Sequence, residues 1–357
     1  MRRLHQPRAR LYASVRSAHL ERAHESPSAI VYLRHRYDFE ESLTEGLEIV
    51  QRRLLSAAML VARSRLDVLE INEPLMRSAL PVTALAVALL AAQPKTRRPL
   101  VVAYAIENAD PFRDGRRGLK ARIKRARDRA LARFVWSRVS RVAFGTPGSM
   151  ACYSEILGPP RRAAVRLIPA LPARRSPPPS SGEEGRVLFL GAFVARKGFP
   201  LVVRAWERVI ELRPDAHITV LGKGQMEDVA RSFARAHPSA EVVVDPPRER
   251  IRAELGRARV LVLPSQPQGG WREQVGLPIV EGLEAGCRIV TTDQTGLAAW
   301  LRDRGHSVLD APTDLTDLAE AIAVQLAVEV GDAALDLPDR DGRAEADEWM
   351  LGGEDAQ

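Results

Sequence analysis

The chain has 357 residues, of which 45% are hydrophobic and 5% aromatic, and its formal net charge is +8. This length accommodates two domains of ordinary size, and the hydrophobic content supports large buried cores. Two cysteines, Cys152 and Cys287, exclude a disulfide framework, and no Cys/His cluster has the spacing of metal ligands.

The N-terminus is basic but lacks the apolar stretch of a secretory signal. The longest apolar run, residues 80–92, is too short to span a bilayer comfortably and is more typical of a buried helix. We therefore expect a cytoplasmic protein, with peripheral attachment to the inner face of the membrane left open.

The first half of the chain alternates between predicted strands and helices. Residues 1–27 are rich in Arg and His with little periodicity, which predicts a poorly ordered lead-in. The alternation that follows predicts a doubly wound α/β domain over residues 28–170. Its expected strands are 29–33, 67–74, 99–108, 141–146 and 164–169, and its expected helices are 40–64, 80–92, 116–138 and 147–157.

Residues 171–185 are rich in Pro and Ser and predict a linker. A second α/β domain is expected over 186–330, with strands at the start of 186–209 and at 217–224, 261–266 and 288–293. Residues 331–357 carry nine acidic and two basic side chains. This acidic tail is either solvated or packed through Trp349 and Met350.

The second domain contains three signals for phosphate and sugar binding. A turn at Gly276 precedes a helix start at Leu277 and Pro278, and such an end attracts phosphate because its N–H groups lack helical partners. Glu273 and Glu281 flank this turn, and carboxylates accept hydrogen bonds from sugar hydroxyls. The pattern therefore favours a nucleotide-sugar.

The other two signals follow predicted strands. Gly191 ends the first strand of the domain, and the basic pair Arg196 and Lys197 comes directly after it. Gly222 and Gly224 end the next strand, where missing side chains allow a ligand to approach closely. Ligands of open α/β sheets bind at these carboxyl ends.

The segments GAFVARKG, LGKG, ARVLVLPS, EQVGLPIVEGLEAG and VTTDQTG, in this order, resemble family 4 retaining glycosyltransferases of the GT-B fold. The resemblance is strong over about residues 185–315 and faint over 65–170. It implies two Rossmann-like doubly wound domains that face a cleft holding the ligand.

The resemblance also implies roles for the motif residues. Glu281 would hold the ribose of the nucleotide and Glu273 the transferred sugar. Gly276, Leu277 and Pro278 would make backbone contacts, and Lys197 would bind the diphosphate. The family usually has an arginine directly after the first glycine, where this chain has Ala192, so Arg196 is the candidate to supply that charge.

The first domain, which carries the acceptor in this family, departs further from the pattern. The family's glycine-rich loop is absent after 29–33, and Glu107 and Asn108 stand where a histidine is often found. Glu107 and Asn108 are therefore acceptor-side candidates, and the alternative is that they cap the next helix. Glu73, at the end of another strand, is a weaker candidate of the same kind.

The predicted helix 116–138 combines Leu119, Ile123, Ala126, Ala130, Phe134 and Val135, expected on one face, with a dense array of Arg and Lys. It is either an ordinary surface helix or a contact with anionic lipid. Nucleic acid is not expected as a partner, because no aromatic interleaving or known nucleic-acid module accompanies the charge.

The resemblance therefore implies a retaining glycosyltransferase that uses a nucleotide-diphosphate sugar and a glycan or lipid-linked acceptor. No metal and no further cofactor are expected, because the protein's own charges would stabilise the leaving diphosphate. The alternatives are a degenerate, non-catalytic GT-B subunit that binds nucleotide-sugar or a partner enzyme and, ranked lower, another enzyme on the same fold.

Overall fold

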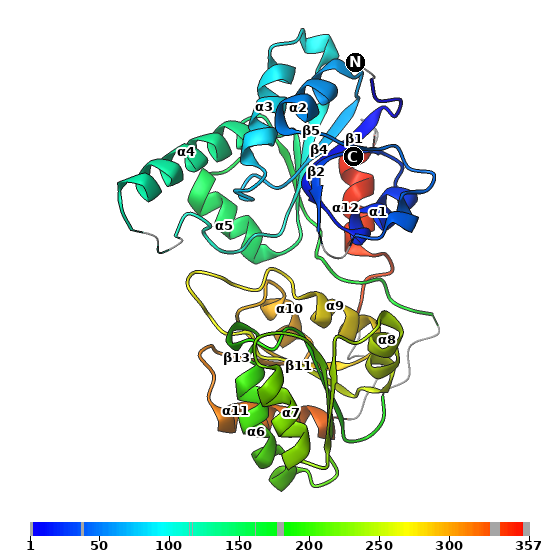
Figure 1. Cartoon of the computed structure of the whole chain (residues 1–357), viewed down its shortest axis with the longest axis vertical. Helices are drawn as coiled ribbons and strands as arrows, with labels where there is room; N and C mark the ends of the chain where they lie inside the picture. Colours follow the sequence, from blue (N-terminus) through cyan, green and yellow to red (C-terminus); the bar gives the residue numbers. More distant parts are fainter. Residues whose placement is uncertain are drawn as a thin grey trace. The chain divides into compact units, whose positions relative to one another are not determined.

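The computed structural model describes residues 3–36, 39–113, 115, 117–160, 162–176, 182–328 and 336–352 (Figure 1). Contacts divide the chain into two compact units. Unit 1 comprises Met1–Pro169 and Gly342–Gln357, and unit 2 comprises Ala170–Asp341. Part of the expected linker, residues 177–181, lies outside the described residues.

Unit 1 is built on a seven-stranded parallel sheet with the order β3-β2-β1-β4-β5-β6-β7. Parallel strands that are covered on both faces need apolar side chains on both, and β4 is accordingly buried at all four positions. The strands are β1 Arg8–Val15, β2 Ala29–His35, β3 Ile49–Gln51, β4 Val68–Ile71, β5 Leu100–Ala105, β6 Arg141–Phe144 and β7 Ala164–Leu167.

Helices cover both faces of this sheet. On one face α2 Leu54–Arg63, α3 Leu80–Ala91, α4 Leu119–Trp136 and α5 Pro147–Leu157 enclose the largest hydrophobic cluster of the unit. On the other face α1 Ser17–Glu25 covers β1 and β2, and α12 Gly342–Leu351 covers β4, β5 and β6. Two 3-10 turns, η1 Glu41–Thr44 and η2 Lys95–Arg97, complete the unit.

The expectation of a poorly ordered lead-in at residues 1–27 is wrong. Residues 8–15 form β1, which pairs in parallel with β2 on one side and β4 on the other, and residues 17–25 form α1. The strand escaped detection because Arg10, which is fully buried, breaks its apolar pattern. Its charge is compensated by partners far away in the sequence.

The expectation of one helix over 40–64 is also wrong. This stretch contains η1, then a turn, then the edge strand β3, and only its last part is the helix α2. Gly46 in the turn has φ +76°, a left-handed conformation that favours glycine and ends the helical path.

The acidic tail was expected to be either solvated or packed through Trp349 and Met350. Its helix α12 is packed against the sheet of unit 1. Met350 is fully buried and Trp349 nearly so, and both contact a cluster that includes Val68, Val102 and Ala143. The acidic character of the tail obscured this apolar stripe.

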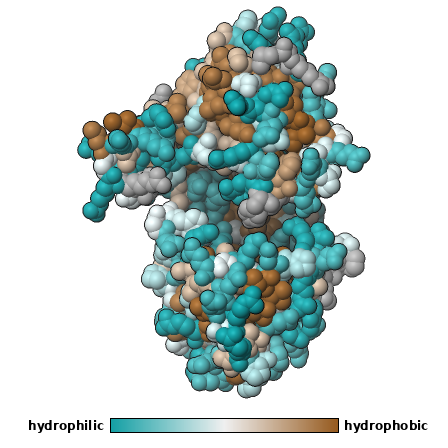
Figure 2. Space-filling view, viewed as in Figure 1, coloured by the Kyte–Doolittle hydropathy of each residue, from teal (hydrophilic) through white to brown (hydrophobic). Residues whose placement is uncertain are grey.

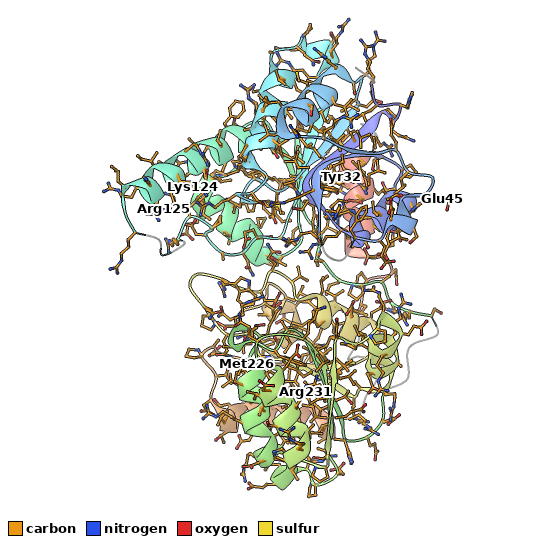
Figure 3. All side chains as sticks on the ribbon, viewed as in Figure 1. Tyr32, Glu45, Lys124, Arg125, Met226 and Arg231 are labelled. Carbon is orange, nitrogen blue, oxygen red and sulfur yellow. The ribbon has the colours of Figure 1, made fainter. Side chains whose placement is uncertain are left out.

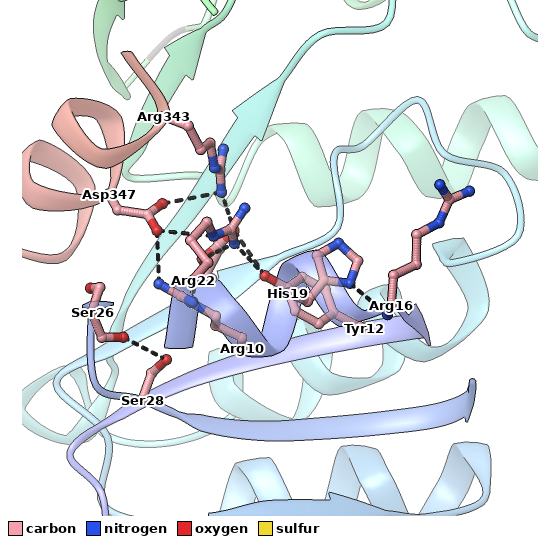
Figure 4. A network of polar contacts seen from close by, with 10 residues as sticks. Arg10, Tyr12, Arg16, His19, Arg22, Ser26, Ser28, Arg343 and Asp347 are labelled. Carbon is pink, nitrogen blue, oxygen red and sulfur yellow. Dashed lines mark hydrogen bonds and ion pairs between the residues drawn. The ribbon is translucent and has the colours of Figure 1, made fainter. Parts of the chain in front are cut away.

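Charge complementarity attaches α12 to the sheet (Figure 4). Arg10 Nη2 donates to Asp347 Oδ2 at 2.8 Å and Arg10 Nε lies 3.0 Å from Glu70 Oε2. Arg22 and Arg343 also contact Glu70 Oε1, at 2.9 and 2.7 Å. Burial alone would raise the pKa of Glu70, but these three guanidinium groups hold it well below its usual range.

We expect Asp347→Ala to destabilise unit 1 by about 3–5 kcal/mol, because it leaves three buried or partly buried arginines with the single carboxylate of Glu70 as their counter-charge. Urea denaturation followed by circular dichroism measures this. Glu348→Ala, at an exposed position on the same helix, is the control and should change the free energy of unfolding by less than about 0.5 kcal/mol. Equal effects of the two substitutions would contradict the role of the network.

Unit 2 contains a six-stranded parallel sheet with the order β10-β9-β8-β11-β12-β13. This is the doubly wound order 3-2-1-4-5-6, which reverses direction between β8 and β11. The strands are β8 Arg186–Leu190, β9 His217–Gly222, β10 Ala240–Val244, β11 Val260–Leu263, β12 Arg288–Thr292 and β13 Ser307–Leu309.

The helices of unit 2 lie on both faces of its sheet (Figure 1). The longest, α6 Phe199–Leu212, packs beside α11 Leu315–Ala327 on one face and buries Trp206 completely. The helix α9 Leu277–Glu284 contacts β11 and β12. The remaining helices are α7 Glu227–Ala236, α8 Arg248–Arg257 and α10 Ala298–Asp303.

Helix α4 forms as predicted, but its buried face differs from the expected one. Leu119 and Ile123 are 69% and 61% exposed, whereas the C-terminal half buries Ala132, Val135 and Trp136. The N-terminal half of α4 extends beyond the helices it packs on, so its apolar spacing serves no core. Within the described ranges, no helix is long and apolar enough to cross a bilayer.

Candidate functional site

The candidate site of unit 2 begins at the point where its strand order reverses. Here β8 and β11 are neighbours, and the chain leaves them through the loops 191–198 and 264–276. The crossover helices that follow lie on opposite faces of the sheet, and ligands of open α/β sheets bind at the carboxyl ends beside such a reversal. Residues of both loops carry the sequence signals for phosphate and sugar.

The two loops touch at Gly198. This glycine has φ +71°, and a Cβ atom placed on it would lie 2.0 Å from the carbonyl oxygen of Pro264. The backbone N–H of Gln266 donates to the carbonyl of Arg196 at 2.9 Å. No other residue type tolerates both the conformation and the contact, so Gly198 fixes the turn η3 Ala195–Lys197 against the end of β11.

This contact brings Lys197 and Glu273 together. The Lys197 ammonium is ion-paired with the Glu273 carboxylate, and both side chains are 13% exposed. Ser265 Oγ donates to the same carboxylate oxygen at 3.4 Å. The resemblance assigns Lys197 to the diphosphate and Glu273 to the sugar, and in the structure the two side chains pair with each other.

Trp271 covers the basic pair. Its ring centroid lies 4.5 Å from Arg196 Cζ and 5.4 Å from Lys197 Nζ, within the range of cation–π interactions. The sequence analysis missed this residue. A lone tryptophan in a polar loop between a buried strand and a helix is the signal that could have identified it.

The N-terminus of α9 lies in the same loop as Glu273. Gly276 is the residue before the helix and has φ +85°, which favours glycine. Leu277 and Pro278 form the first turn, and the Leu277 side chain is 68% exposed. The partial positive charge of a helix N-terminus therefore faces the end of the sheet where Lys197 stands.

Glu281 is one turn further along α9 and is partly buried. Arg248 Nη1, at the start of α8, lies 3.9 Å from Glu281 Oε1. Burial raises the pKa of Glu281, Arg248 opposes this rise and Glu284 adds to it. Arg248 was not singled out from the sequence, because an arginine at a helix start is common in a chain with 53 Lys and Arg residues.

The glycines Gly191, Gly222 and Gly224 bring β8 and β9 close together at their ends. A Cβ atom on Gly222 would lie 1.9 Å from the carbonyl oxygen of Gly191. A Cβ atom on Gly224 would lie 2.9 Å from the backbone nitrogen of Phe193. Their immediate structural role is thus close backbone packing at the carboxyl ends of β8 and β9.

In unit 1 the acceptor-side candidates lie beside the partly buried carboxylate of Glu73. Glu73 Oε2 accepts hydrogen bonds at 3.0 Å from the backbone N–H groups of Ile106 and Glu107 and from the Tyr153 hydroxyl. Glu107 Oε1 accepts from the N–H of Ala109 at 3.2 Å, a contact within the loop itself. The next helix, α4, has Gly118 as its N-cap residue, so the alternative that Glu107 and Asn108 cap this helix is wrong. Glu107 and Asn108 are half-buried in the loop that follows β5.

Burial raises the pKa of Glu73 to about 7, the Glu107 carboxylate adds to the rise, and the three hydrogen bonds oppose it. Glu73 therefore organises the loop that carries Glu107 and Asn108, and Tyr153 helps to anchor it. Among the described residues, no group of three or more His, Cys, Asp or Glu side chains is arranged to hold a metal ion.

Glu73 should give unit 1 a pH-dependent stability. Between the usual pKa of 4.5 and about 7 the folded state binds more protons than the unfolded state, so the free energy of unfolding falls as pH rises. The loss is about 3 kcal/mol over this window. Glu73→Gln should remove this component when denaturation is measured at pH 4.5 and 7.

The control for this prediction is Glu155→Gln, which replaces a carboxylate that is 73% exposed in the same unit. It should keep the pH dependence of the wild type. Identical pH profiles for Glu73→Gln and the wild type would contradict the raised pKa.

One family model matches a large part of unit 2. Residues 184–327 match the family model of glycosyl transferases group 1. No curated protein sequence matches the chain significantly.

Solved structures resemble the whole chain. WaaG, a glycosyltransferase involved in lipopolysaccharide biosynthesis, has 15% identity and a TM-score of 0.63, with 97% of this chain and 100% of that chain covered. HepE from Anabaena, in complex with UDP and glucose, has 12% identity and a TM-score of 0.63, with 96% and 95% covered.

An α,α-trehalose-phosphate synthase (UDP-forming) from Burkholderia vietnamiensis has 13% identity and a TM-score of 0.57, with 98% of this chain and 97% of that chain covered. At these identities the similarity shows the fold. The predicted GT-B fold, with two doubly wound α/β units, is confirmed.

Proposed function

We propose that this chain is a glycosyltransferase of group 1 that transfers a sugar from a nucleoside-diphosphate donor to an acceptor hydroxyl and retains the anomeric configuration. The observation that carries the proposal is the assembly at the strand reversal of unit 2. There Lys197, Glu273 and the N-terminus of α9 occupy two loops in direct contact. This combination suits a diphosphate bonded to a sugar.

The donor would separate the Lys197–Glu273 ion pair. The Lys197 ammonium would turn to the diphosphate and stabilise the charge that develops as the diphosphate leaves. The released Glu273 carboxylate would accept hydrogen bonds from the sugar hydroxyls. The ammonium exchanges one anionic partner for another, and the sugar hydroxyls donate hydrogen bonds to the released carboxylate, so neither partly buried charge is left without a partner.

Glu281 would hold the ribose of the donor. Its side chain is 33% exposed, and Arg248 beside it offers a further contact to the nucleotide. HepE was solved with UDP and with UDP-glucose, and TarM from S. aureus was solved with UDP, which supports a nucleoside diphosphate as the ligand of this fold.

We expect a nucleoside diphosphate to stabilise the protein selectively. At 100 times its dissociation constant it should add about 2.7 kcal/mol, which a thermal-shift titration with UDP, GDP and ADP detects. Glu281→Ala should weaken binding about 10- to 100-fold, because it removes hydrogen bonds to a charged acceptor.

Glu284→Ala is the matched control for Glu281→Ala. It removes a partly exposed carboxylate three residues further along α9, which is paired with Arg175. This variant should bind the nucleotide like the wild type. Equal affinities for wild type and Glu281→Ala would refute the assignment of Glu281.

On the acceptor side we propose that a glycan or lipid-linked hydroxyl approaches the loop of Glu107 and Asn108. The position of this loop at the carboxyl end of β5 supports the proposal, as does its support by Glu73. The similarity to WaaG favours a lipid-linked acceptor.

A non-catalytic GT-B subunit is the second candidate function. Ala192 in place of an arginine and the absence of a glycine-rich loop after β2 favour it. Sugar transfer separates the two functions, because a non-catalytic subunit would bind the donor without releasing nucleoside diphosphate in the presence of any acceptor. The intact Glu273 and Glu281 motif favours the enzyme.

We further propose that α4 binds the anionic inner face of a membrane. The helix carries seven basic residues and one acidic residue, Asp128, which is buried against Arg77. Figure 2 shows apolar surface at the tip of α4 amid hydrophilic surface, and Figure 3 shows Lys124 and Arg125 on the same helix. Exposed Leu119 and Ile123 would enter the lipid while the cations bind headgroups.

Vesicle co-sedimentation tests this surface. The protein should bind vesicles with 30% anionic lipid at low salt, because each basic residue near the surface contributes about 1 kcal/mol to the binding free energy. It should dissociate at high salt, because salt screens this attraction. The double variant Leu119→Ser, Ile123→Ser should bind more weakly. Val324→Ser, at an exposed apolar position of unit 2, is the control. Equal binding to neutral and anionic vesicles would exclude the proposal.

A further inference from the structure

The arrangement around Trp271 addresses the departure at Ala192. The family pattern places an arginine after the first glycine of unit 2, and this chain has Ala192 there. Arg196 lies four residues further on, in the turn η3, and its guanidinium stacks on Trp271 with Cζ 4.5 Å from the ring centroid. The same ring lies 5.4 Å from Lys197 Nζ. The indole of Trp271 therefore contacts the cationic groups of two adjacent residues.

The loop around Trp271 is built to return toward η3. Gln268 and Trp271 form an antiparallel bridge, and the Trp271 N–H donates to the Gln268 carbonyl at 2.9 Å. Gly269 and Gly270 between them have φ +56° and +82°. Positive φ at both central positions is the requirement of a type I′ turn, which reverses the chain within two residues. The base of the loop is attached to η3 by the Gln266 N–H to Arg196 carbonyl hydrogen bond.

Two adjacent cations repel each other, and Arg and Lys side chains have high rotamer entropy. The face of an indole carries negative potential, so it offsets this repulsion and restricts the guanidinium to one region. Among the described residues, no carboxylate forms an ion pair with Arg196, so its N–H groups stay available for an anion.

We propose that Trp271 is a positioning residue that holds Arg196 beside Lys197, so that Arg196 binds the donor diphosphate in place of the arginine missing at position 192. This inference rests on the proposed function and deepens it. Arg196 contributes the bidentate hydrogen bonding that guanidinium offers phosphates, and Lys197 contributes a point charge. Trp271 itself need not touch the diphosphate.

Isothermal titration with a nucleoside diphosphate and the corresponding monophosphate tests the proposal in the full-length protein. Trp271→Ala and Arg196→Ala should each weaken diphosphate binding about tenfold. The double variant should be no weaker than Arg196→Ala alone, because both substitutions remove one and the same contribution. Monophosphate affinity should change less than diphosphate affinity in every variant.

Two substitutions separate positioning from general packing. Trp271→Phe keeps an aromatic face and should recover most of the affinity that Trp271→Ala loses. Trp271→Leu keeps apolar bulk without that face and should not. The matched control is Trp300→Ala, which removes another Arg–Trp stack, with Arg304 Cζ 4.4 Å from the ring centroid, and should leave diphosphate affinity unchanged.

The outcomes distinguish this inference from the proposed function. If the wild type binds none of UDP, GDP and ADP, the donor site is refuted and this inference with it. If the wild type binds but Trp271→Ala matches it, or if the effects of Trp271→Ala and Arg196→Ala add, only the positioning role is refuted. The thermal stability of each variant verifies that it is folded.

Discussion

The contact between Gly198 and Pro264 is the constraint on which the candidate donor site depends. A parallel sheet brings the ends of β8 and β11 side by side, but it does not specify how the loops beyond them meet. Only a residue without a side chain fits a left-handed turn against a carbonyl oxygen 2.0 Å from its missing Cβ. That fit places Lys197 against Glu273 and Arg196 against Trp271. The chemistry of the site thus follows from one backbone approach.

The site also compensates its own charges. Glu273 is ion-paired with the ammonium of Lys197, and the ring of Trp271 makes cation–π contacts with both Arg196 and Lys197. A partly buried cation without a partner would cost free energy, and these contacts offset that cost before the donor binds. Charge compensation also holds unit 1 together. There the ion pairs of Arg10 with Glu70 and Asp347 join β1 to β4 and to α12.

The sequence predicted most of unit 2, because its strands are apolar runs bounded by glycines and its loops carry chemically distinctive residues. The pairing of Lys197 with Glu273 was not predicted, since it depends on loop geometry. In unit 1 the sequence-based prediction was wrong where the burial of a charged residue depends on partners far away in the chain. The strand β1 was not predicted, because it contains the charged residue Arg10. The carboxylate partner that allows Arg10 to be buried, Asp347, lies 337 residues away in the sequence. The apolar spacing of α4 was real, but Leu119 and Ile123 face solvent and not the core.

A crystal structure of the protein with a bound nucleoside diphosphate tests the central claim most directly. The account predicts the diphosphate at the N-terminus of α9, within contact of Lys197 and Arg196. It also predicts that the Lys197–Glu273 ion pair has opened and that the ribose lies against Glu281. A diphosphate bound elsewhere in unit 2, with the ion pair intact, would contradict the account.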